Sequence, residues 1–143
     1  MAGRDRPVRV PSIVRWLPAV AQAALIFILS AQPDLHLAEE PLLDFLLHKL
    51  GHLVVYGLLA ALVAWALEAP RGPAPGGRGG GSRWWAVPLL LCIAYGASDE
   101  LHQTFVHGRG PSPVDVLIDG LGAALGLAAY AWLARRRRSR RPV

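Results

Sequence analysis

Four stretches of the chain are apolar over a length that suits a membrane-spanning helix. They cover about residues 13–31, 50–67, 84–105 and 113–133. Such a helix needs about 20 mostly apolar residues to cross a hydrocarbon core about 30 Å thick. The third stretch is purely apolar only as far as Ala97, and the fourth carries Asp115 and Asp119 in its first two turns. The pattern predicts an all-α integral membrane bundle of four transmembrane helices, with its unusual polar residues in the last two.

A shorter amphipathic segment precedes the second stretch. Residues 41–49 read PLLDFLLHK and follow Glu39 and Glu40. Proline suits the first position of a helix, and acidic residues are stabilising near the positive end of the helix dipole. We therefore expect a short interfacial helix before the second span, or an extension of that span.

The distribution of charge predicts the orientation. Cations precede the first span and occupy the Gly/Pro-rich segment 69–83 and the tail 135–143, whereas the segment between the first two spans is mainly acidic. Cytoplasmic loops are enriched in Lys and Arg. The sequence thus predicts a multi-pass protein of the inner (cytoplasmic) membrane with both termini in the cytoplasm. The segment 69–83 is then a flexible cytoplasmic loop, and residues 135–143 form a basic cytoplasmic tail.

A cleaved signal peptide is the competing interpretation of the first span, because a basic start precedes an apolar stretch. The apolar run is long for a signal sequence, and Pro33 with Asp34 is a poor cleavage context. A retained helix is the expected outcome.

Composition agrees with this class. The chain has 143 residues, which is the size of one domain, and 53% of them are hydrophobic. The single cysteine, Cys92, excludes an intramolecular disulfide. The net charge of +5 comes from arginines that flank apolar stretches, so it indicates membrane topology and does not predict nucleic-acid binding.

The ionisable residues gather on one side of the predicted topology. All ten acids except Asp5 and Glu68, and all five histidines, fall on the outer side or in the outer parts of the helices. Lipid-exposed charges are costly, so such residues normally face a bundle interior or a wet cavity. Helical spacing places them in three stripes: His48, His52 and Tyr56; Tyr95, Asp99, His102 and Gln103; and Asp115, Asp119, Gly122 and Gly126. We expect these stripes to converge in an outward-facing polar cluster.

Several roles suit this cluster. The candidate ligand-binding residues are Lys49, His52, Asp99, Glu100, Gln103, Arg109, Asp115 and Asp119. The candidate catalytic residues are Asp99, Glu100, His102 and Asp115, and a divalent metal would use Asp99, His102, Asp115 and Asp119. Ser30 and Gln32 are expected to shape the exit of the first span. The G-x-x-x-G pair Gly122 and Gly126 allows close packing, either within the bundle or in a homodimer.

Three motifs resemble those of the VanZ-like family, which is named after a teicoplanin-resistance protein. They are IFILSAQP at 26–33, HKLGHLVVYGLLA at 48–60 and DELHQTFVHGRGPSPVDVLIDGLGAALG at 99–126. The last is similar to the family pattern D-E-x-x-Q-x-F-x-x-G-R-x-x-S-x-x-D followed by glycines. The chain departs from the family at His48, where an acid is frequent, and at Asp119, where an asparagine is common. The resemblance implies a small membrane protein of the cell envelope with a link to resistance against a glycopeptide that acts on cell-wall precursors.

Three hypotheses stay open for the polar cluster. It binds an anionic lipid headgroup, a cell-wall precursor or a glycopeptide; or it is the site of a membrane-embedded enzyme, metal-dependent or not, that acts on a lipid-linked phosphate or headgroup; or it is an ion-pair network that only holds the helices together.

Overall fold

The computed structural model describes residues 12–33, 37–68 and 84–139. Every regular element in these ranges is a helix, in the order η1 (Ser12–Trp16), α1 (Leu17–Ser30), α2 (Pro41–Glu68), α3 (Ala86–Gln103) and α4 (Pro113–Ser139). The predicted all-α class is confirmed. The predicted loop 69–83 and residues 140–143 of the predicted tail lie outside the described residues, as do Arg4, Arg6 and Arg9.

Three helical segments within the described ranges are long and apolar enough to cross a membrane. They are Ile13–Ser30, Pro41–Leu67 and Pro113–Arg137. Large apolar side chains such as Val20, Leu58 and Leu117 are exposed on their outer faces, as expected for surfaces that meet lipid. The chain is therefore a membrane protein.

Helix α3 differs from the other three. Its 18 residues give a length of about 27 Å, close to the thickness of the hydrocarbon core. Its last turns contain Asp99, Glu100 and His102, which lower its mean hydropathy. The fourth span therefore remains a prediction.

Helix α2 is longer than the span expected at 50–67. It begins at Pro41 and continues without a break to Glu68, so the expected short interfacial helix is not a separate element. Its start is held locally, because the Glu40 carboxylate accepts a hydrogen bond from the backbone N–H of Leu43 at 2.6 Å. With 28 residues, α2 is about 42 Å long and exceeds the hydrocarbon thickness. Residues 41–49 are thus the first turns of the second span.

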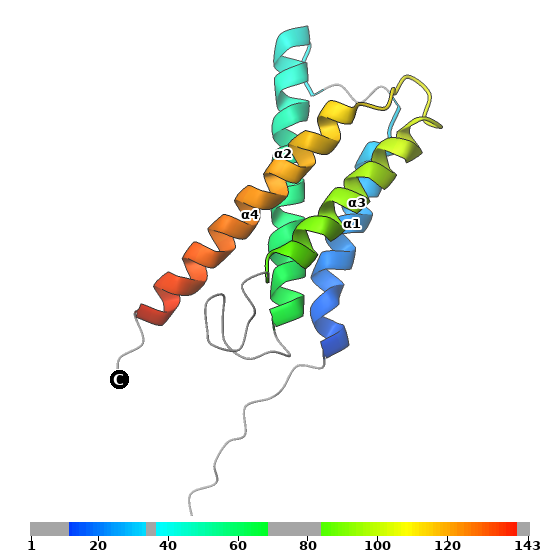
Figure 1. Ribbon diagram of the computed structural model, residues 1–143. Coiled ribbons are helices and arrows are strands. Elements are labelled where there is room, and N and C mark those ends of the chain that lie inside the picture. The colour runs from blue at the N-terminus through cyan, green and yellow to red at the C-terminus, as the bar shows by residue number, and fades with distance from the viewer. Residues whose placement is uncertain (1–11, 34–36, 69–83, 140–143) are drawn as a thin grey trace, which may run out of the picture.

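The helices are arranged so that the polar segments meet at one end of the bundle (Figure 1). Helices α1 and α3 end there, and helices α2 and α4 begin there. We call this the polar end. The described chain starts and finishes at the opposite end, which carries Arg15 on η1 and Arg135–Arg137 on α4.

The packing of α2 against α4 depends on glycine. A side chain on Gly126 would collide with the backbone of Gly57, and one on Gly122 would lie 2.9 Å from the Leu53 Cα atom. The two backbones therefore touch, as small residues permit in membranes. The Gly122/Gly126 face is covered by α2 of the same chain, so it is not available for the homodimer that the sequence left open.

Candidate functional site

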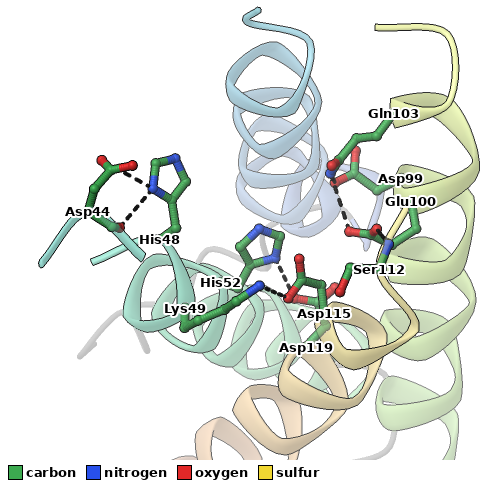
Figure 2. Close-up of polar contacts among 10 residues, drawn as sticks. All are labelled: Asp44, His48, Lys49, His52, Asp99, Glu100, Gln103, Ser112, Asp115 and Asp119. Atoms are coloured by element: carbon green, nitrogen blue, oxygen red, sulfur yellow. Dashed lines mark hydrogen bonds and ion pairs between the residues drawn. The ribbon is translucent and has the colours of Figure 1, made fainter. Parts of the chain in front are cut away.

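The predicted site residues lie at the polar end on three helices and one turn (Figure 2). Lys49 and His52 come from α2, whereas Asp99, Glu100 and Gln103 come from the last turns of α3. Asp115 and Asp119 come from the first turns of α4. Arg109, which Figure 2 does not draw, lies in the segment between α3 and α4. The three stripes expected from helical spacing do converge, and the contacts within them divide the residues into distinct groups.

Two pairs join α2 to α4. The Lys49 Nζ atom donates to the Asp115 carboxylate, and His52 Nδ1 lies 2.9 Å from Asp119 Oδ1. Lys49 and His52 are three residues apart on α2 and Asp115 and Asp119 are four apart on α4, so the two pairs stack one helical turn above the other. Asp119 is fully buried, and its second oxygen has no hydrogen-bond partner. That oxygen faces Gly96 of α3, where an added Cβ atom would lie only 2.8 Å away.

The acids of α3 make a second set of contacts. Asp99 accepts a hydrogen bond from the Ser30 hydroxyl at 2.5 Å, which ties α3 to the end of α1. Glu100 accepts one from the backbone N–H of Ser112 at 2.6 Å, just before α4 begins. Gln103 Nε2 lies between the two carboxylates, at 3.4 Å and 3.3 Å. Asp99, Glu100 and Gln103 are all buried, so these contacts fix the three helix ends relative to one another.

Ser30 is the residue whose role the sequence did not indicate. It was expected to shape the exit of the first span, and instead its hydroxyl is the partner of Asp99. Serine at the end of an apolar helix gives no specific signal. Its position within the motif IFILSAQP was the only indication available.

His102 does not join the carboxylates. Its ring stacks on Phe27 with the ring centroids 4.5 Å apart, and its buried Nε2 atom has no hydrogen-bond partner. The described residues contain no group of three or more His, Cys, Asp and Glu side chains placed to hold a metal ion. The candidate metal ligands Asp99, His102, Asp115 and Asp119 are therefore not assembled into one site.

Arg109 is held differently from Lys49. Its Nε atom donates to the backbone carbonyl of Gln32 at 3.2 Å, and no carboxylate among the described residues lies within ion-pair distance. Gly108, just before it, has a φ of 78°, a conformation that favours glycine and turns the chain. The guanidinium group thus keeps its terminal nitrogens available at the polar end.

Two adjoining pockets open beside Arg109. The first has a volume of about 460 Å³ and a wall of mixed polar and apolar character, whose charged or polar residues include Glu39, Asp44, His48, Lys49, Arg109 and Asp115. The second has a volume of about 150 Å³ and lies between α1 and α2, with Ile26, Leu29, Val55 and Tyr56 in its wall. His48, His52 and Arg109 line both pockets. We call them the polar pocket and the apolar groove.

Comparison with known proteins identifies the family. The sequence model of the VanZ/LLP1 family matches residues 9–134, which is most of the chain. No curated protein and no solved structure gives a significant match. The family match covers α1, α2, α3, most of α4 and both pockets described above, and it agrees with the motifs at 26–33, 48–60 and 99–126. The chain belongs to the VanZ/LLP1 family.

Proposed function

We propose that this protein binds the anionic headgroup of a membrane lipid or of a lipid-linked cell-wall precursor in the polar pocket. The observation that carries the proposal is Arg109, a cation at the wall of a pocket of about 460 Å³, whose terminal guanidinium nitrogens have no hydrogen-bond partner among the described residues. A planar guanidinium group matches the oxygens of a phosphate with two parallel hydrogen bonds.

The contacts at the polar end support a division of labour. Lys49, His52, Asp99, Glu100, Asp115 and Asp119 contact partners on other helices or at the start of α4, so their main role is to hold the pocket walls. Arg109 and His48 face the pocket without being used in these interhelical pairs. The ion-pair hypothesis thus accounts for the residues that hold the pocket wall together, and the binding hypothesis accounts for the residues that face the pocket.

The proposed orientation places the pocket outside the cytoplasmic membrane. The opposite end of the bundle carries the arginines, which favours a cytoplasmic location for that end. An outward-facing pocket would meet headgroups of the outer leaflet and the precursors of cell-wall synthesis. A contribution to teicoplanin resistance belongs to this proposal through those precursors.

Cysteine labelling tests the orientation. Cys92 is buried and can be left in place. We expect Gly110→Cys to react with a membrane-impermeant maleimide in intact spheroplasts, whereas Ser139→Cys reacts only after the membrane is permeabilised. The reverse pattern would place the polar pocket in the cytoplasm and exclude outer-leaflet ligands.

Loss of Arg109 tests the binding function. We expect Arg109→Gln to weaken binding of phosphatidylglycerol or a polyprenyl phosphate by about 10- to 100-fold, because a hydrogen bond to a charged group contributes about 1.5–3 kcal/mol. Binding is measured by titration of the detergent-purified protein, with its melting temperature recorded in parallel. Thermal stability without ligand should be unchanged, since Arg109 makes one hydrogen bond, to a backbone carbonyl, within the described part of the chain.

Arg136→Gln is the matched control. Arg136 is exposed at the opposite end, where it lies over the Trp132 ring, and its removal changes the net charge equally. It should leave binding nearly unchanged. Equal losses in the two variants would contradict a specific site. Binding of teicoplanin alone would identify the ligand as the glycopeptide, and turnover of a bound lipid would support the enzyme hypothesis instead.

A further inference from the structure

We infer that the ligand is an anionic glycerophospholipid whose acyl chain lies in the apolar groove between α1 and α2 while its phosphate lies in the polar pocket. This inference rests on the proposed headgroup function and specifies its ligand. It follows from the wall that the two pockets share.

The first observation is the shared wall. Arg109, His48 and His52 border both pockets, so a molecule that contacts the guanidinium group from the polar pocket lies at the mouth of the groove. The groove wall beyond that mouth is largely hydrocarbon, with Ile26 and Leu29 from α1 and Val55 from α2. A charged group at one end and hydrocarbon at the other match an amphiphile and not a free phosphate.

The second observation is that the groove is open towards the outer surface of the bundle. Leu29 and Leu37 in its wall are 42% and 49% exposed. Gly51 also lines it, and an added Cβ atom there would meet no atom within 4 Å. A lipid that diffuses in the bilayer can therefore place a chain between α1 and α2 without first separating the helices.

The third observation concerns Tyr56, which is fully buried in the groove wall. Its hydroxyl has no hydrogen-bond partner among the described residues. An unsatisfied buried hydroxyl is costly, and a ligand oxygen would satisfy it. In a glycerophospholipid the ester oxygens lie between the phosphate and the acyl chain, which is where such an acceptor is needed. A polyprenyl phosphate has no oxygen at that position.

The test compares two probes that differ in the chain. Lysophosphatidic acid carries one acyl ester, and glycerol phosphate is the same headgroup without it. Dissociation constants of both are measured on the full chain in a neutral maltoside detergent, for the wild type and for Gly51→Leu, which fills the groove. Val54→Leu is the matched control. Val54 lies on α2 three residues after Gly51, is exposed, and does not line the groove.

We expect Gly51→Leu to weaken lysophosphatidic acid binding at least about tenfold and to leave glycerol phosphate binding unchanged. Val54→Leu should change neither dissociation constant. Leucine is also a better helix former than glycine, so the variant should fold. Should it fail to fold, Leu29→Ser makes the groove polar. The control is Ile28→Ser, at the neighbouring exposed position that does not line the groove. Leu29→Ser is expected to show the same selective loss.

The outcomes separate this inference from the proposed function. If Arg109→Gln weakens both probes while Gly51→Leu and Leu29→Ser weaken neither, the groove does not hold the chain and only the headgroup site stands. If neither probe binds the wild type, both proposals are wrong. Tyr56→Phe gives an independent readout: it should reduce the preference for the acyl ester over an ether-linked analogue, and an unchanged preference would contradict the role of the hydroxyl.

Discussion

The Gly126→Ala variant is expected to lower the free energy of unfolding by about 2–3 kcal/mol, the range of a strongly overpacked core. The added Cβ atom would collide with the Gly57 carbonyl group and lie 2.6 Å from its Cα atom. The obstacle is backbone, so no rotamer change relieves it. Relief requires α2 and α4 to move apart, and this would disturb the Lys49–Asp115 and His52–Asp119 pairs at the polar end.

Gly120→Ala is the matched control in the same helix. Its Cβ atom would lie 3.5 Å from the Ile93 side chain, which is an ordinary contact, and alanine favours a helix by up to about 1 kcal/mol over glycine. We therefore expect this variant to be as stable as the wild type or more stable. Reversible unfolding in mixed micelles measures both changes. Equal stability of the two variants would show that the α2 and α4 backbones do not touch at Gly57.

The Lys49→Met variant is expected to cost about 2–3 kcal/mol of stability, somewhat less than the loss of one partner from a fully buried ion pair. It leaves Asp115, whose side chain is 13% exposed, without its interhelical cation. The double variant Lys49→Met with Asp115→Leu should recover most of that loss, because replacing both charges removes the unpaired carboxylate.

A double-mutant cycle measures the coupling between the two residues. A coupling near zero would contradict the interhelical pair. The same variants decide whether Lys49 supports the pocket wall or binds the ligand directly. If Lys49→Met leaves stability unchanged and weakens headgroup binding as strongly as Arg109→Gln, the lysine is a ligand residue and the division of labour proposed for the polar end is wrong.

These two predictions concern the scaffold on which the binding proposal depends. The close contact at Gly57, Gly122 and Gly126 sets the distance between α2 and α4. That distance in turn allows Lys49 to reach Asp115 and His52 to reach Asp119. A destabilised scaffold would therefore also lose ligand, which is why Arg109→Gln, with no expected effect on stability, is the sharper test of binding.

The amino-acid sequence by itself determined the helical class, the membrane character, the approximate bounds of the helices and the family. Long apolar runs report burial in lipid directly, because each residue contributes its own transfer free energy. The expected bounds of the apolar spans differ most from the observed helix bounds where a helix continues through polar residues. Helix α4 continues through Arg135–Arg137 to Ser139, since arginine is a good helix former and needs no lipid to stay helical. Helix α2 likewise starts at Pro41 and not at 50.

Only the tertiary structure decided how the polar residues divide. Helical spacing placed Asp99 and His102 on one stripe, yet Asp99 contacts Ser30 and His102 stacks on Phe27. Lys49 and Arg109 were equivalent cations in the sequence, but Lys49 is paired with Asp115, whereas no carboxylate of the described residues lies within ion-pair distance of Arg109. The physical reason is that periodicity fixes which residues share a face of one helix, whereas the partner of that face depends on how helices distant in the chain rotate and pack together.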